Sequence, residues 1–318
     1  MDYYNQYKRP IFIGLFIGFV VLVIILIIAD VRAVAQIFAD IDLRFIPLIV
    51  LMAPLNYLLR FIKWNYYLKI SGIRPEPKMN RYIFISGLSM TITPGKVGEL
   101  LKCYLMKEHI DAPISKTSSI VMAERVTDAM AMVVLALLGL LAFPHGKTVV
   151  TVVTAILIMV VVIFHSNYLF NFFFNQLIKI RLLKKSASFL RNFQLSAKAL
   201  FSARHLVFAV GISVISWGFE GLVVYLAIIA LGGEISILGS FFIVSFSSLL
   251  GVLSFLPGGV GVAEGSILAI LIFTGIRTDI AAATTVITRI STLWLGVALG
   301  IVGLILTNRE LIRQKNKN

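Results

Sequence analysis

The chain has 318 residues, of which 59% are hydrophobic and only 14% are charged, whereas soluble globular proteins have about 25% charged residues. This composition excludes a soluble globular protein and predicts an all-α polytopic membrane protein. The net charge of +14 lies in a few segments beside apolar runs, as expected for cytoplasmic loops next to anionic lipids. We therefore expect no nucleic-acid partner.

Apolar runs of about 20 residues predict membrane-spanning helices. We place these helices at about 10–29, 45–70, 115–142, 148–165, 205–231 and 280–306. The first run resembles a secretory signal, and "AVAQ" at 33–36 resembles a cleavage site. The run is too long for a signal core, and Asp30 and Arg32 precede that site, so we predict an uncleaved first span.

Two further apolar stretches, 82–110 and 237–275, are each interrupted near the middle by Pro-Gly. Proline removes a backbone donor and clashes with the preceding turn, so neither stretch is expected to form one straight helix. We predict a helical hairpin from each stretch.

Basic residues predict the orientation of the chain. The segment 165–204 has seven basic and no acidic residues, and the N-terminus, the stretch 74–81 and the tail 307–318 are also basic. All four segments can be cytoplasmic only if each hairpin enters and leaves the membrane on one side. We therefore predict two re-entrant hairpins, the first entering from the cytoplasm and the second from outside, with both termini cytoplasmic in a multi-pass protein of the cell membrane.

The segment 166–204 mixes aromatic and leucine side chains with its basic residues. A solvated loop would be less apolar, so we predict an interfacial amphipathic helix that sets orientation and takes no direct part in substrate chemistry.

The two hairpins belong to an internal repeat. "TPGKVGE" at 93–99 corresponds to "LPGGVGVAE" at 256–264, and an arginine follows each proline after 31 or 32 residues. We predict one membrane domain made of repeats at 10–142 and 148–306, each with two spans, a hairpin and a third span. Because each repeat crosses the membrane three times, the second copy is inverted relative to the first. Inverted repeats are typical of secondary transporters. Chance recurrence in a glycine-rich chain is the competing explanation.

The residues after Pro94 form a polar face. Helical spacing places Lys96 and Glu99 together with Lys102 or Cys103, and such a face inside a membrane must meet protein or a water-filled cavity. A half-helix that begins at depth also presents free N–H groups that suit an anion such as phosphate. The residues predicted to form the hairpin breaks are Pro94, Gly95, Gly98, Pro257, Gly258, Gly259 and Gly261.

The two arginines are the main candidates for binding an anionic headgroup. Arg289 has no acidic neighbour on its helix face, so it needs Glu264, Glu220 or a bound anion as its partner. Guanidinium suits bidentate contacts to phosphate, and we rank Arg289 first. Arg125 either pairs with Asp128 in "AERVTD" or contacts substrate.

Several acidic residues join the candidate site. Glu99 and Glu264 follow their prolines at similar distances, and they either contact substrate or a coupling proton, or neutralise the two arginines. Glu124 is a further candidate. Arg60 and Lys63 lie near the inner end of their span, where we expect them to snorkel to the interface.

"TPGKVGELLK" with "AERVTD", and "LPGGVGVAEG" with "TRIS", resemble the flippase-like membrane domain of the lysylphosphatidylglycerol synthase family, also called the multiple peptide resistance factor. The resemblance covers about residues 10–306. It implies translocation of a lipid with a charged headgroup between leaflets. The synthase proper has a further aminoacyl-transfer domain after its membrane part, whereas this sequence ends at Asn318, so we expect a stand-alone member that does not make aminoacylated lipid by itself.

The favoured function is therefore a lipid flippase or scramblase without catalytic residues, and not an enzyme. Its substrate would be a phospholipid, an aminoacylated lipid or a polyprenyl-phosphate-linked sugar. The competing functions are an intramembrane lipid-modifying enzyme and a transporter of a small soluble solute. The four scattered histidines and the single Cys103 show no metal-ligand spacing, so we expect no metal and no cofactor. Expected partners are membrane lipids and a separately encoded lipid-modifying enzyme or glycosyltransferase, and a homo-oligomer is left open.

Overall fold

The computed structural model describes residues 3–93, 97–140, 147–166, 168–169, 171–172 and 187–315, and it is an all-α membrane protein, as predicted. The helices are α1 (Tyr3–Ile28), α2 (Val31–Ala39), η1 (Leu43–Phe45), α3 (Ile46–Ile70), α4 (Pro77–Leu88), η2 (Val97–Leu100), α5 (Leu101–Ile110), α6 (Ile114–Gly139), α7 (Lys147–His165), α10 (Ala187–Leu200), α11 (Ala203–Ala230), α12 (Ile237–Leu253), α13 (Val262–Phe273), α14 (Thr278–Arg289), η4 (Ile290–Trp294) and α15 (Leu295–Lys315).

Four segments of the described chain are long and apolar enough to cross a membrane. They are Ile11–Ile28, Leu43–Ile70, Ala203–Ala230 and Thr278–Gln314, and each coincides with a predicted span. The helices α6 and α7 form at the two other predicted spans. Large apolar side chains face outward on α1, where Phe12 is 70% exposed, as a lipid-facing surface requires.

Helix α2 was not predicted from the sequence. The side chain of Asp30 accepts a hydrogen bond from the Arg32 nitrogen and caps the helix. Its apolar side chains pack against α14. The residues that resemble a signal-cleavage site are therefore part of a helix.

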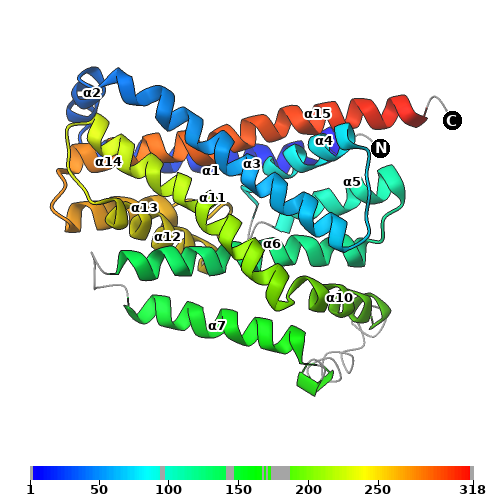
Figure 1. Cartoon of the computed structure of the whole chain (residues 1–318). Coiled ribbons are helices and arrows are strands. Elements are labelled where there is room, and N and C mark those ends of the chain that lie inside the picture. The colour runs from blue at the N-terminus through cyan, green and yellow to red at the C-terminus, as the bar shows by residue number, and fades with distance from the viewer. Residues whose placement is uncertain are drawn as a thin grey trace.

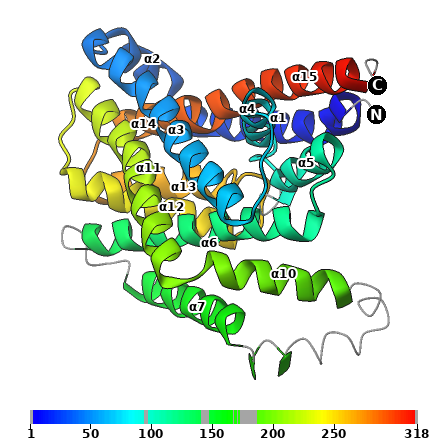
Figure 2. The same cartoon turned by 45° about the vertical axis from the view of Figure 1, so that its right-hand side comes forward.

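Both Pro-Gly stretches form helical hairpins. In Figures 1 and 2 the two termini lie at one end of the molecule, and α4 begins and α5 ends at that end. Helix α12 begins and helix α13 ends at the opposite end of the molecule. The first hairpin starts earlier than predicted, at Pro77, and its second arm begins with a 3₁₀ turn at 97–100. Re-entry into a bilayer stays a prediction, and Pro94, Gly95 and Lys96 lie outside the described residues.

The tips of the two hairpins contact each other. The Gly258 nitrogen lies 3.4 Å from the Thr93 carbonyl oxygen, and a Cβ atom on Gly258 would lie 3.3 Å from the Ile92 Cα atom. Gly258 and Gly259 have φ angles of +61° and +68°, which only glycine adopts readily. The second Pro-Gly sequence therefore forms the turn that brings the hairpin tips together.

Each hairpin also packs against the last helix of the other half of the chain. Helix α15 lies along α4, and α12 lies along α6. A Cβ atom on Gly300 of α15 would lie 2.0 Å from the Ser89 nitrogen, so glycine is required for this close approach. The two halves are interlocked rather than side by side.

Helices α3 and α11 cross through reciprocal hydrogen bonds. The Asn56 amide donates to the Ser216 carbonyl oxygen at 2.9 Å, and the Ser216 hydroxyl donates to the Asn56 carbonyl oxygen at 3.2 Å. These two residues are 160 positions apart. Gly72 and Gly232, which have φ angles of +68° and +76° after α3 and α11, have the same separation.

The predicted amphipathic segment contains α10. Gln194, Ala197 and Leu200 are buried, and Arg191 and Leu195 are exposed. The buried side packs against α6, so an amphipathic helix is present at 187–200. The remainder of the segment, apart from its short described pieces, lies outside the described residues.

Candidate functional site

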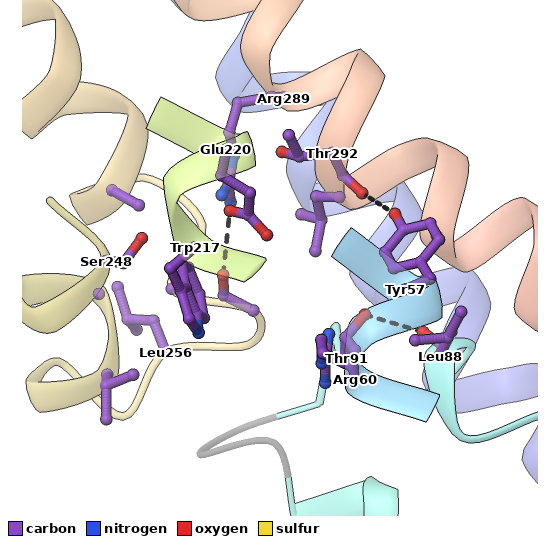
Figure 3. Close-up of a pocket in the computed structure, with 17 residues that line it drawn as sticks. Tyr57, Arg60, Leu88, Thr91, Trp217, Glu220, Ser248, Leu256, Arg289 and Thr292 are labelled. Atoms are coloured by element: carbon purple, nitrogen blue, oxygen red, sulfur yellow. Dashed lines mark hydrogen bonds between the residues drawn. The ribbon is translucent and has the colours of Figure 1, made fainter. Parts of the chain in front are cut away.

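A polar cavity lies where the two halves of the chain meet. It has a volume of about 80 Å³ and is lined from both halves (Figure 3). Tyr57 and Arg60 come from α3, and Trp217 and Glu220 from α11. The remaining lining residues are Leu88, Thr91, Ser248, Gly251, Val252, Leu256, Gly258, Gly259, Ala263, Arg289, Thr292, Leu293 and Gly296.

The lining residues of α3 and α11 are related by position. Tyr57 and Trp217, and likewise Arg60 and Glu220, have the separation of 160 residues found for the crossing point of the two helices. The two helices therefore present an aromatic ring and then a charged group to the same cavity. The charge is positive on α3 and negative on α11.

Arg289 lies in the cavity wall and pairs with Glu264. Its Nε donates to Glu264 Oε1 at 2.6 Å, and its Nη2 donates to the Gly258 carbonyl oxygen at 3.3 Å. The side chain of Arg289 is 12% exposed and that of Glu264 is 1% exposed. Of the partners predicted from the sequence, the structure places Glu264 against Arg289.

Glu264 also caps α13. Its Oε2 accepts a hydrogen bond from the Gly261 nitrogen at 2.7 Å. The first helical turn after the Pro-Gly break was expected to offer its N–H groups to a phosphate, whereas in the described structure a carboxylate of the same helix holds one of them. Glu264 thus bridges the helix N-terminus and Arg289.

The first half has a larger charged network. Glu99 lies 3.3 Å from Arg125, 3.7 Å from Arg60 and 4.0 Å from Lys102, measured between the closest charged atoms. Lys102 donates to Glu124 at 2.6 Å and lies 4.3 Å from the centre of the Trp64 ring. Glu99 is therefore the junction of three cations.

A second branch of this network connects α3, α6 and α11. Asp128 pairs with Arg125 at 3.0 Å and also with Lys63, which donates to Ser213 of α11 at 2.7 Å. Lys63, Asp128 and Ser213 are buried. The i,i+3 pair of Arg125 and Asp128 that the sequence predicted is formed, and it belongs to a network that includes both halves.

The expectation that Arg60 and Lys63 snorkel to the interface is wrong. Lys63 is fully buried and Arg60 is 6% exposed, because Asp128 of α6 pairs with Lys63 and Glu99 of η2 lies 3.7 Å from Arg60. Arg60 lines the cavity, whereas Arg125 does not appear in its lining. The Nε of Arg60 is buried and makes no hydrogen bond within the described part of the chain.

Glu220 and Tyr57 form opposite parts of the cavity wall. Glu220 accepts a hydrogen bond from the Asn56 amide at 3.2 Å. The Tyr57 hydroxyl donates to the Thr292 carbonyl oxygen in η4, a π-helical turn directly after Arg289 (Figure 3). π-helical turns occur frequently at functional sites, and this one places a backbone acceptor beside the cavity.

The structure gathers most of the predicted residues into two clusters. Glu99, Lys102, Glu124, Arg125 and Asp128 form the network of the first half, and Glu264 and Arg289 form the pair of the second half. Lys96 lies outside the described residues. The sequence reasoning missed Tyr57, Trp217 and the role of Arg60, although the separation of 160 residues between Arg60 and Glu220 was a signal that could have found Arg60. Within the described residues, no group of three histidine, cysteine or acidic side chains could hold a metal ion.

Comparison with known proteins finds similar membrane proteins in archaea. A UPF0104 membrane protein of Pyrococcus horikoshii is 26% identical over 93% of this chain and 96% of its own length. A UPF0104 membrane protein of Methanocaldococcus jannaschii is 27% identical over 70% of this chain and 96% of its own length. A third, from Methanothermobacter thermautotrophicus, is 21% identical over 98% of this chain. The family described as the lysylphosphatidylglycerol synthase TM region matches residues 11–300, and the chain therefore belongs to this family.

Proposed function

We propose that the protein moves a lipid with a charged or phosphate headgroup between the leaflets of its membrane, as a flippase or scramblase and not as an enzyme. The observation that carries the proposal is the polar cavity between the two halves, with Arg60 on one side and Arg289 on the other. A buried cation in a membrane protein is costly, and it commonly marks a substrate path. Guanidinium groups suit the oxygens of a phosphate.

The position of the cavity supports alternating access. Reciprocal hydrogen bonds at the crossing of α3 and α11, and equivalent loops after both helices, support two inverted repeats. In transporters of this design the substrate site lies at the repeat interface. The hairpin tips meet beside the cavity, so a small movement of one hairpin would open it.

Glu264 occupies the position at Arg289 that a phosphate group would take in this proposal. In the described state its carboxylate accepts from both Arg289 and the Gly261 nitrogen. A phosphate that enters the cavity could replace this carboxylate at Arg289 while Glu264 keeps its bond to Gly261. The arginine would then stay paired with an anion in both the empty and the occupied state.

A leaflet-exchange assay tests the proposal. The purified protein is placed in liposomes with labelled phosphatidylglycerol, lysylphosphatidylglycerol or polyprenyl phosphate, and the label in the outer leaflet is quenched. We expect faster exchange of at least one lipid and a loss of about tenfold or more in Arg289→Gln. Arg289→Lys retains the charge without the bidentate geometry and should lie between the two.

The matched control is Arg277→Gln, because Arg277 pairs with Asp279 near the molecular surface and has a side chain that is 69% exposed. Undiminished exchange in folded Arg289→Gln would reject the assigned role. If no lipid exchanges in the wild-type protein, the proposal fails. A product of altered mass would then favour a lipid-modifying enzyme, and uptake of a soluble solute would favour a solute transporter.

A further inference from the structure

A second cavity, of about 420 Å³, lies at the junction of α3 and α4, near the end of the molecule at which both termini lie. Three of its lining residues are cationic, namely Lys69, Arg74 and Arg81, and none is acidic. All three are exposed, and none forms an ion pair with another described residue. We call this cavity the basic cavity.

The wall of the basic cavity is built from fixed polar groups. Trp64 donates its indole N–H to Asn80 Oδ1 at 2.9 Å, and the Asn80 amide donates to Asn65 Oδ1. These bonds occupy the oxygen of Asn65 and leave its amide N–H groups without a partner among the described residues. Since Asn65 and Asn80 both line the cavity, the wall presents hydrogen-bond donors as well as cations.

The loop that holds Arg74 contains a hydrogen-bonded turn and two prolines. Gly72 turns the chain at the end of α3 with φ +68°, and the Ile73 nitrogen closes the turn on the Leu68 carbonyl oxygen at 2.9 Å. Pro75 and Pro77 then fix the backbone on both sides of Glu76. Glu76 is exposed and is not among the lining residues.

The equivalent junction of the second half has the opposite charge. Gly232 turns the chain after α11 with φ +76°, and the Gly233 nitrogen closes that turn on the Ile228 carbonyl oxygen at 2.9 Å. A cavity of about 340 Å³ adjoins it, whose one charged lining residue is Glu234. Arg74 and Glu234 both stand two positions after the positive-φ glycine. Equivalent backbone turns thus place a cation in the first half and a carboxylate in the second half.

We propose that the basic cavity binds a phosphate group, carried by a lipid headgroup or by a soluble phosphate compound, and that the equivalent cavity of the second half does not. Two guanidinium groups and an ammonium group around free amide donors match the charge and the several acceptor oxygens of phosphate. The inference concerns binding outside the central cavity, so it holds whether or not the protein moves lipid.

Isothermal titration calorimetry of the full chain in a neutral detergent tests the inference. The two probes are dihexanoylphosphatidic acid and inorganic phosphate, titrated separately. Binding of both with similar affinity identifies a soluble phosphate group as sufficient, whereas binding of dihexanoylphosphatidic acid alone identifies a lipid headgroup. In either case we expect the double variant Arg74→Gln/Arg81→Gln to bind at least tenfold more weakly than the wild type.

Two controls separate this site from a general effect of charge. Lys78→Gln/Lys107→Gln removes the same two charges, but these lysines pair with Glu310 and Asp111 outside the cavity lining, and we expect less than a threefold change. Glu234→Gln tests the second cavity and should also change affinity less than threefold. The inference is overturned if neither probe binds the wild type, if the Arg74/Arg81 variant binds normally, or if the lysine control weakens binding equally.

Discussion

The two halves of the protein surround equivalent arginines with different chemistry. Arg125 lies in a network with Glu99 and Asp128, and further lysine and arginine side chains share these carboxylates. Arg289 has Glu264 as its acidic partner in the described structure, together with the Gly258 carbonyl oxygen. The difference teaches that a similar sequence motif can form a network of shared ion pairs in one half and a single ion pair beside a cavity in the other.

The reason lies in the residue directly before the arginine and in the residue three positions after it. Where α6 has Glu124 and Asp128, the corresponding positions next to Arg289 are Thr288 and Thr292. Each threonine hydroxyl donates to a carbonyl oxygen of its own helix at 2.7 Å. The threonine hydroxyls have hydrogen-bond partners within the helix and add no charge near the arginine. Arg289 therefore remains paired with Glu264 beside the cavity.

The largest expected effect is the removal of a carboxylate from the network of the first half. Glu124→Ala leaves Lys102 buried without its closest partner, and breaking a buried pair in this way costs about 3–5 kcal/mol. Thr288→Ala at the corresponding position should cost about 1 kcal/mol, since one intrahelical hydrogen bond is lost. Chemical unfolding in detergent micelles measures both, and similar losses would contradict the assigned asymmetry.

The second test compares the arginines themselves. Arg125→Gln should lower the free energy of unfolding by about 1 kcal/mol, because Glu99 and Asp128 keep other cations within ion-pair distance. Arg289→Gln should lower it by about 3 kcal/mol, since the buried carboxylate of Glu264 loses the cation with which it pairs. Unfolding and leaflet exchange are measured on the same preparations. A reversed order in stability would show that the other cations of the first-half network do not compensate for the loss of Arg125.

The third test addresses Arg60 and Glu220, the two charged residues of the cavity wall that are 160 positions apart. Arg60→Gln should reduce exchange of an anionic lipid about tenfold, which corresponds to about 1.4 kcal/mol of lost interaction. Glu220→Gln should leave that exchange within a factor of three, because a carboxylate offers no attraction to phosphate. The exchange assay with phosphatidylglycerol measures both, and equal losses would mean that the cavity wall acts only as a structural unit.

The smallest effect is expected for the pair of Arg44 and Asp42 at the start of the second span. Arg44 donates hydrogen bonds to Asp42, and these bonds lower the pKa of the Asp42 carboxyl. A lowered pKa means that the contribution to stability is present above the pKa of the unfolded chain, about 3.9, and is lost as the pH falls through the folded value. Asp42→Asn should shift the melting temperature at pH 7 less than any buried variant. A shift equal to that of Glu124→Ala would show that burial does not control these energies.

Much of the fold could be predicted from the sequence. Long apolar runs predicted the spans, and the second Pro-Gly predicted the position of a hairpin turn, because hydrocarbon length and a missing backbone donor act locally. Helix α2 was missed because it has only nine residues, although Asp30 before it carried a capping signal. The pairing of Glu99 with Arg125 and of Glu264 with Arg289 was among the alternatives considered, and the order of residues alone could not decide between a carboxylate and a bound anion.

The placement of Arg60 shows the limit of the sequence. Its position near the end of a span suggested snorkelling, a local property of one helix. Whether its guanidinium reaches the interface or a buried carboxylate depends on which helices stand beside α3, and that was decided by the packing of α3 against α11 and by the approach of η2. The sequence by itself determined the class of protein, the spans and the repeated motif. The tertiary structure decided which charges share a cavity, because the energy of a buried charge depends on partners far away in the chain.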